Sequence, residues 1–186
     1  MARQLIPQIA ATDSNAVNGT EEKWVKHYRE LEKPLYSVVF RWLWDATQSQ
    51  DIVQEAFLRC WQQRKRIKPE GFKAFVYKTA LNLARNERRR RRLWQLVPLA
   101  TVHVEANRED AVEFLQKSIR DAIDALSEKH KRVLLLCEVA GLSYKEVASV
   151  VGVKEGTVGS RRNRGLLLVR QHLQAAGVQW DEDGSK

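Results

Sequence analysis

The side chains best suited to bind nucleic acid lie in one segment near the C-terminal end of the chain, residues 154–170. This segment has five basic residues and the single carboxylate of Glu155, a net charge of +4. On a helix, Ser160, Asn163 and Arg164 would share one side. Basic side chains can hold the phosphates of duplex DNA while polar ones reach base edges in the major groove. The segment is therefore predicted to be a DNA-binding helix, and a solvated helix that binds nothing is the alternative.

The residues just before this segment would position it as the second helix of a helix-turn-helix. Gly141 suits the left-handed residue that closes one helix, and Ser143 with Glu146 forms a capping box that opens the next. The helix opened in this way spans 144–151, and Gly152 ends it. A short helix, a glycine turn and a basic helix in this order are typical of proteins that place the second helix in the major groove.

A second cationic segment, 85–92, has six arginines against Glu87 alone, a net charge of +5. It follows a predicted helix that starts at Phe72 and carries aromatic and amide side chains. Aromatic, amide and cationic side chains together suit melted or single-stranded DNA, because unstacked bases stack on aromatic rings and arginines bind the phosphate backbone. Alternatively, Phe75 and Leu81 belong to the core and the arginines form a solvated tail. Both interpretations are retained in part.

Between 50 and 63 the pattern predicts a helix with two unlike faces, opened by a capping box of Thr47 and Gln50. One face is apolar and is expected to be buried. The other forms a narrow stripe in which carboxylates and an amide surround a leucine, a surface suited to a basic partner protein. From the residues alone, an ordinary solvated face is the favoured interpretation. The stripe consists of Asp51, Gln54, Glu55 and Leu58.

Residues with the chemistry for catalysis are scattered. The four histidines have no carboxylate or cysteine at ligand spacing, so no catalytic residue, metal site or cofactor is expected. Cys60 and Cys137 lie far apart within apolar helical patterns, which favours buried reduced thiols. An enzyme, including one that processes nucleic acid, is therefore a remote option.

Composition bounds the class of protein. A formal charge of +9 over 186 residues should attract a polyanion such as nucleic acid, and no apolar run is long enough to span a membrane. The first residues lack the pattern of a secretory signal, so the cytoplasm is the expected compartment.

Apolar spacing is helical in two blocks, which predicts an all-α chain of two small domains joined by a flexible linker. The first block begins near Glu21, and Pro34 is expected to open a new helix inside it. Around 98–113 the chain is acidic, either as a spacer or as a mimic of nucleic acid, and the spacer is favoured. Ser127 is expected to cap a helix spanning 128–140. The expected divisions are a tail at 1–20, a domain at 21–96, a linker at 97–112, a domain at 113–176 and a tail at 177–186.

Taken together, four stretches in this order resemble the extracytoplasmic-function sigma factors of bacterial RNA polymerase. They are Asp51 to Trp61, Phe72 to Arg92, Ala125 to Leu136, and Gly141 to Val158. The resemblance covers about 21–173. It implies a sigma-two domain followed by a sigma-four domain, in a factor that binds core polymerase, directs it to a promoter and opens the DNA.

The resemblance also implies partners and site residues. Core polymerase would be bound through the clamp helices of its largest subunit, by the Asp51, Gln54, Glu55 and Leu58 stripe, and through the flap of its second largest subunit. An anti-sigma factor is a further expected partner. The minus-ten element would face Tyr77, Asn82, Arg85, Asn86 and Arg89, and the loop at 65–70 would help to capture a base. The minus-thirty-five duplex would face Glu155, Thr157, Ser160, Arg161, Asn163 and Arg164.

Two residues depart from the family pattern. Gly159 stands where Lys or Arg is common, and Arg162 stands where an apolar core residue is common. We expect Arg162 to lie over the core with its head in water. A self-contained helix-turn-helix regulator, whose N-terminal block dimerises or senses a ligand, is the alternative function.

Overall fold

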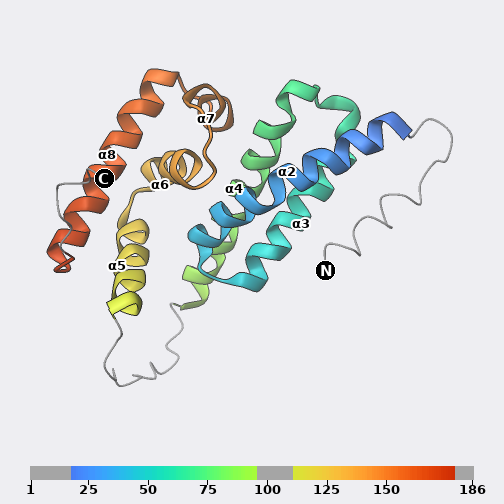
Figure 1. Cartoon of the computed structure of the whole chain (residues 1–186). Coiled ribbons are helices and arrows are strands. Elements are labelled where there is room, and N and C mark those ends of the chain that lie inside the picture. The colour runs from blue at the N-terminus through green and yellow to red at the C-terminus, as the bar shows by residue number, and fades with distance from the viewer. Residues whose placement is uncertain (1–17, 96–110, 179–186) are drawn as a thin grey trace.

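The computed structural model of the chain describes residues 18–95 and 111–178, and all regular structure in these two ranges is helical (Figure 1). This confirms the expected all-α fold. The N-terminal helices are α2 (Asn18–Leu43), α3 (Ala46–Gln62), the short η2 (Arg64–Arg66) and η3 (Pro69–Gly71), and α4 (Phe72–Gln95). The C-terminal helices are α5 (Ala111–Ala125), α6 (Glu128–Leu134), the π-helix η4 (Leu135–Val139), α7 (Tyr144–Val151) and α8 (Glu155–Ala175).

Helices α2, α3 and α4 form the N-terminal bundle, in which each helix packs on the other two (Figure 1). The expected helix start at Pro34 was wrong, because α2 is continuous through that residue. Proline removes one backbone hydrogen bond from a helix interior. Packing compensates for this loss, since Leu35, Val38 and Val39 directly after it are fully buried against α3 and α4.

A tight reversal joins α2 to α3 and sets the start of α3. Trp44 adopts a left-handed conformation with φ of 55°, and Asp45 is the N-cap, its carboxylate accepting a hydrogen bond from the Gln48 backbone N–H at 2.9 Å. The expected capping box of Thr47 and Gln50 was therefore wrong. Asp45 caps in its place because the helix already includes Ala46 and Thr47.

The helix-turn-helix is formed by α7 and α8 as predicted. Ser143 accepts from the Glu146 backbone N–H, and the Glu146 carboxylate accepts from the Ser143 backbone N–H, so the capping box is confirmed. Gly141 and Gly152 have φ of 65° and 72°, in the left-handed region that glycine adopts without strain. These two glycines fix the angles at which the chain enters and leaves α7.

The helix expected over 128–140 divides into α6 and the π-helix η4. Ser127 occupies the N-cap position of α6, but its hydroxyl makes no cap hydrogen bond and lies 3.0 Å from His130 Nδ1 instead. In η4 the Ala140 N–H donates to the Leu135 carbonyl, and Leu142 N–H donates to that of Leu136. The wider turn keeps both leucines buried while the chain turns toward α7.

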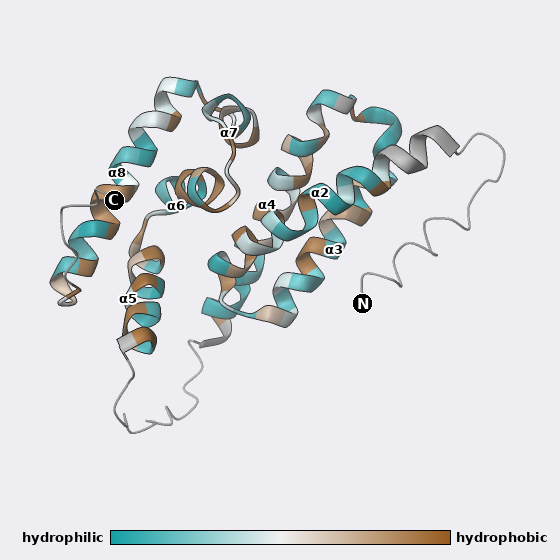
Figure 2. Cartoon of the chain, in the orientation of Figure 1, coloured by the Kyte–Doolittle hydropathy of each residue, from teal (hydrophilic) through white to brown (hydrophobic). Residues whose placement is uncertain are grey.

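The two helical groups pack against each other through α4 with α7 and α2 with η4 (Figure 1). Their buried apolar residues form a continuous cluster that includes Val76 and Tyr77 of α4 together with Leu136 and Val147. Figure 2 shows hydrophobic and hydrophilic residues side by side along each helix, as expected for amphipathic helices in a bundle. The C-terminal group, α5 to α8, is therefore held on one side of the N-terminal bundle.

The expected tails and linker lie largely outside the described residues. Residues 18–20 of the expected N-terminal tail begin α2, and 111–112 of the expected linker begin α5. Among residues 18–95 and 111–178, no helix combines the length and apolar character that a membrane crossing requires.

Candidate polymerase and nucleic-acid interfaces

The acidic stripe lies on the outer side of α3. Asp51 is exposed, while Gln54, Glu55 and Leu58 are half-buried. Glu55 is paired with Arg59, whose Nε lies 2.6 Å from the Glu55 Oε1 atom. The opposite side of the helix is buried in the bundle, as the apolar pattern predicted, through Ile52, Val53, Ala56, Phe57 and Cys60.

A groove of about 520 Å³ runs beside the stripe, between α2 and α3. Gln54 lines it from α3, and Glu32 and Tyr36 line it from α2. The Tyr28 hydroxyl donates to Glu32 Oε1 at 3.0 Å, and burial, followed by this bond, raises the pKa of that tyrosine. Sequence reasoning missed this half of the surface. The available signal was the spacing of four residues between Tyr28, Glu32 and Tyr36.

The expected minus-ten residues do not share one environment on α4. Asn82, Arg85, Asn86 and Arg89 are exposed, whereas Tyr77 has no exposed surface. Burial raises the pKa of Tyr77, with a smaller contribution from the Glu146 carboxylate on α7. As the helices are arranged here, Tyr77 is covered and DNA could reach only the other four.

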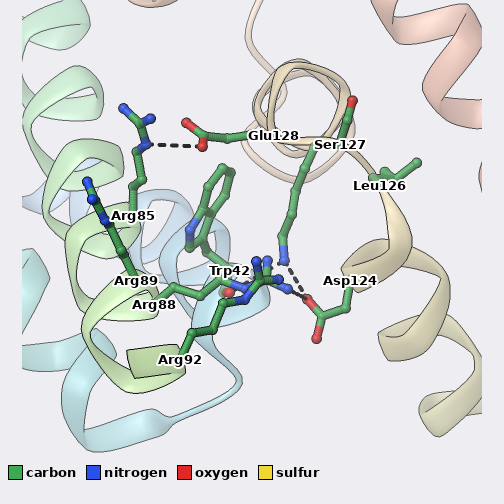
Figure 3. Close-up of a pocket in the computed structure, with 10 residues that line it drawn as sticks. Trp42, Arg85, Arg88, Arg89, Arg92, Asp124, Leu126, Ser127 and Glu128 are labelled. Carbon is green, nitrogen blue, oxygen red and sulfur yellow. Dashed lines mark hydrogen bonds and ion pairs between the residues drawn. The ribbon is translucent and has the colours of Figure 1, made fainter. Parts of the chain in front are cut away.

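Carboxylates of the C-terminal group meet the arginines of α4. Arg85 Nε lies 3.0 Å from Glu128 Oε2, and an Arg88 Nη2 to Asp124 Oδ1 distance is also 3.0 Å. A pocket of about 420 Å³ lies between the two groups of helices (Figure 3). Five cations and two carboxylates are among its lining residues, so the pocket is strongly positive. The lining side chains used below are Trp42, Arg85, Arg88, Arg89, Arg92, Asp124, Glu128 and Lys131.

Lys131 is a buried cation at the base of this pocket. Its side chain is 1% exposed, its Nζ lies 2.6 Å from Asp124 Oδ1, and it donates to the Trp42 backbone carbonyl at 3.4 Å. The ammonium also lies 5.2 Å from the centre of the Trp42 ring. Burial lowers the pKa of Lys131 to about 8, against the opposing hydrogen bond to Asp124. Sequence reasoning missed this residue, because Trp42, which it contacts, is 89 positions away in the sequence.

The arginine run is helical and largely paired, so the interpretation as a solvated tail was wrong for it. Arg88 and Arg91 are 24% and 35% exposed. Arg91 Nη2 lies 2.8 Å from Asp45 Oδ2, the same carboxylate that caps α3. Two hydrogen bonds lower the pKa of Asp45. The larger effect comes from the Gln48 backbone N–H and the next from the Arg91 side chain. The run is therefore partly a structural clamp between α4 and the start of α3.

The loop expected to capture a base is built from η2 and η3. Lys65, Arg66, Lys68 and Glu70 are exposed, and Ile67 packs against the core. Next to the loop in the sequence, three aromatic rings form a cluster, and an arginine makes a cation–π contact with one of them. Trp24 lies 5.4 Å from Trp61 and 4.4 Å from Phe72, and the Arg64 guanidinium lies 4.2 Å from the Trp61 ring centre.

Helix α8 presents the polar side that the sequence predicted. Glu155, Ser160, Asn163 and Arg164 are exposed, while Thr157 and Arg161 are half-buried. Val158 and Gly165 on the opposite side are buried. Gly165 faces α6, since a Cβ there would lie in ordinary contact with Leu134, 3.7 Å from its Cβ. The polar side of α8 is therefore accessible from solvent.

The two departures from the family pattern both lie beside Tyr144. A Cβ at Gly159 would lie against the Tyr144 ring, 3.4 Å from its nearest atom. Arg162 Nε donates to Glu138 Oε1 at 2.5 Å, and Arg162 Nη1 lies 3.5 Å from the Tyr144 hydroxyl. The head of Arg162 lies at the exposed surface, as expected. It is also paired there with Glu138, and so it ties α8 to η4.

The histidine, cysteine and acidic side chains of residues 18–95 and 111–178 include no group of three or more that could hold a metal ion. Cys60 and Cys137 are free thiols, and burial raises the pKa of both, that of Cys60 to about 12. Neither is activated as a nucleophile.

Comparison with known proteins shows which family the sequence belongs to. Residues 27–93 match the family model of sigma-70 region 2, and residues 116–169 match that of sigma-70 region 4. The ECF RNA polymerase sigma factor SigL of Mycobacterium tuberculosis is 31% identical over 157 residues, which cover 81% of this chain and 89% of SigL. The chain belongs to the ECF sigma factors. The resemblance that the sequence suggested is thereby confirmed.

Other relatives of this ECF sigma factor are more distant. SigE of Mycolicibacterium smegmatis is 26% identical over 171 residues, covering 88% of this chain and 66% of SigE. Among solved structures, CnrH in complex with the cytosolic domain of CnrY has a TM-score of 0.66 at 20% identity, over 93% of this chain and 97% of that one. RpoE in complex with the anti-sigma factor NepR from Bartonella quintana has a TM-score of 0.63 at 17% identity, over 81% and 96%. These two structures share the fold.

Proposed function

We propose that this ECF sigma factor binds core RNA polymerase, directs it to specific promoters and assists DNA melting for transcription initiation. The observation that carries this proposal is the pair of family matches, region 2 followed by region 4, on a chain whose α4 and α8 are both cationic. The sigma-two domain is proposed to span 21–96 and the sigma-four domain 113–176, which contain the matched residues. The bond-forming chemistry belongs to the polymerase, and this chain is proposed to have no catalytic residue.

Three surfaces are proposed to divide the work. The stripe on α3, from Asp51 to Leu58, would dock on the clamp helices of the largest polymerase subunit, and the sigma-four domain would contact the flap of the second largest. The exposed residues of α4 from Asn82 to Arg89, with the loop at 65–70, would bind the melted minus-ten strand. The polar side of α8 would bind the minus-thirty-five duplex.

Control by an anti-sigma factor is part of the proposal. The supporting observation is that two proteins of the same fold, CnrH and RpoE, were solved with CnrY and with the anti-sigma factor NepR. Action in the cytoplasm is proposed because RNA polymerase transcribes there. A stand-alone helix-turn-helix regulator is not favoured, since it would not explain why residues 27–93 match sigma-70 region 2.

The test of polymerase docking is a pull-down of purified core enzyme with D51K/E55K. Reversing both charges should weaken binding at least about tenfold, because lysines would face a basic partner surface. The swap E55R/R59E keeps the net charge and a pair at the same spacing but moves the carboxylate off the stripe, so it should also weaken binding. Thermal melts should show that both variants remain folded. Wild-type affinity in D51K/E55K would refute the assigned docking surface.

Promoter-directed transcription tests the function as a whole. Purified core enzyme and this chain should initiate RNA synthesis at discrete sites on a genomic library. A stand-alone regulator would instead hold a palindromic duplex tightly without polymerase. Failure to initiate at any site would contradict the proposal.

A further inference from the structure

The side of α4 that is proposed to bind DNA faces the chain's own C-terminal helices and forms ion pairs with them. We propose that the free protein adopts a closed state in which Asp124 and Glu128 of the sigma-four domain compete with promoter DNA for the arginines of α4. This inference rests on the proposed function, because it assumes that α4 binds the minus-ten strand. It adds a built-in restraint that needs no second protein.

The contacts involve two of the residues expected to bind DNA, Asn82 and Arg85, together with the neighbouring Arg88. Arg85 is paired with Glu128 at 3.0 Å, and Arg88 with Asp124 at 3.0 Å (Figure 3). A third contact is made by Asn82, whose side-chain oxygen lies 3.5 Å from Arg132 Nη2. A carboxylate paired with an arginine occupies the position that a DNA phosphate oxygen would take. DNA and the sigma-four domain therefore cannot use these two arginines together.

The burial of two α4 side chains also supports the closed state. Tyr77 and Val76 on α4 have no exposed surface, and Val147 and Leu136 of the C-terminal group belong to the same buried cluster. At the other end of α4, Lys73 Nζ lies 2.8 Å from Glu146 Oε1 on α7. C-terminal side chains therefore contact α4 at several points between Lys73 and Arg88. Tyr77, which lies near Glu146 of α7, has no surface on which a base could stack in this arrangement.

The same interface includes features that favour opening. Trp42 Nε1, Tyr77 Oη and Arg132 Nε are buried without a hydrogen-bond partner among the described residues. Each such group lowers the stability of the closed state, because it could form a hydrogen bond to water if the two domains separated. Lys131 adds to this cost as a cation with 1% exposure. The closed state is therefore expected to be reversible.

Charge makes DNA an effective competitor for this surface. Arg89 and Arg92 line the pocket with no carboxylate partner within residues 18–95 and 111–178. The two carboxylates leave the pocket with an excess of positive charge, so a phosphate backbone can approach before the pairs break. The Arg85 and Glu128 side chains are 57% and 42% exposed, so salt should weaken their attraction and favour opening.

The test compares D124N/E128Q with D121N/E113Q, a control that removes the same charge from exposed carboxylates of α5 outside the interface. One readout is the affinity of the free full-length chain for a short fluorescein-labelled single-stranded DNA. The other is hydroxyl-radical footprinting of Tyr77 by mass spectrometry, with Tyr28 as the internal reference. Because the D124N change would leave Lys131 without its carboxylate partner, E128Q alone serves as a second, milder variant, and thermal melts check folding.

We expect D124N/E128Q to bind the DNA at least about fivefold more tightly than D121N/E113Q, with increased oxidation of Tyr77. E128Q should change both readouts in the same direction by less. Equal DNA affinity in test and control, or a gain in affinity with Tyr77 still protected, would overturn the proposal. Neither readout uses polymerase, so a failed closed state is distinguished from a failed sigma-factor function, which only wild-type transcription with core enzyme reports.

Discussion

Glu146 performs two roles at once: its Oε2 atom accepts from the Ser143 backbone N–H at 2.8 Å, and its Oε1 atom lies 2.8 Å from Lys73 Nζ. The first contact caps α7, the first helix of the helix-turn-helix. The second joins α7 to α4 of the N-terminal bundle. A local capping residue is therefore also a link between the domains, and substitutions can separate the two roles.

Glutamine at position 146 should separate them. E146Q keeps an oxygen that can accept the Ser143 hydrogen bond but loses the charge, so the free energy of unfolding should fall by about 0.5 kcal/mol, as for a half-exposed ion pair. E146A loses the cap as well and should lose about 1 to 2 kcal/mol. K73M, which removes only the ion pair, is the matched control. Urea denaturation of the full chain measures all three, and equal losses in E146Q and E146A would contradict the double role.

Acid should remove the contribution of this carboxylate. The Lys73 hydrogen bond lowers the pKa of Glu146 from 4.5 to about 2. Because the pKa is lower in the folded chain, the stabilisation is complete above the unfolded value and is lost as the pH falls toward the folded one. The difference in Tm between wild type and E146Q should therefore shrink as the pH falls from about 5 to about 3. A difference that stays constant over this range would contradict the assignment.

The turn of the helix-turn-helix should depend on its glycine. Gly152 has φ of 72°, so G152A should cost about 1 to 2 kcal/mol of stability and weaken duplex binding by misdirecting α8. Gly156 lies in α8, where a Cβ would meet no atom within 4 Å. G156A should leave stability unchanged or raise it by up to about 1 kcal/mol. Thermal melts of the pair test this contrast, and equal Tm values would oppose it.

Arg164 should contribute a phosphate contact at the minus-thirty-five element. R164A should weaken binding of the holoenzyme to a promoter found by in vitro transcription, and should reduce the slope of log affinity against log salt by about 1. K26A removes an exposed cation of α2 and should leave footprinting at that element unchanged. An unaltered footprint in R164A would mean that the recognition side of α8 is misassigned.

Local signals predicted the elements well where a short spacing defines the structure. The Ser143 and Glu146 capping box and the left-handed Gly152 follow from residues within one turn of each other, so the sequence alone contains the information. The Pro34 boundary failed because burial of Leu35 in the bundle decided it, and no local pattern shows that burial. The Thr47 boundary failed for another reason: the N-cap is Asp45, a local signal that the sequence interpretation passed over in favour of Thr47.

The sequence predicted the candidate site as separate surfaces. The amphipathic pattern was sufficient to predict which side of α3 and which side of α8 face the solvent. The covering of α4 was not predicted. Arg85 and Glu128 are 43 positions apart in the sequence, and no periodicity connects them.

Sequence by itself determined the all-α class, the caps of the helix-turn-helix, the cationic charge and the family, because caps, turns and periodicity act between near neighbours. Only the tertiary structure decided that Tyr77 is buried, that the Lys131 ammonium lies over the Trp42 ring, and that Glu128 is paired with Arg85. These outcomes depend on how two packed helical groups meet, and the physical reason is that burial and ion pairing are set by distances in space between residues far apart along the chain.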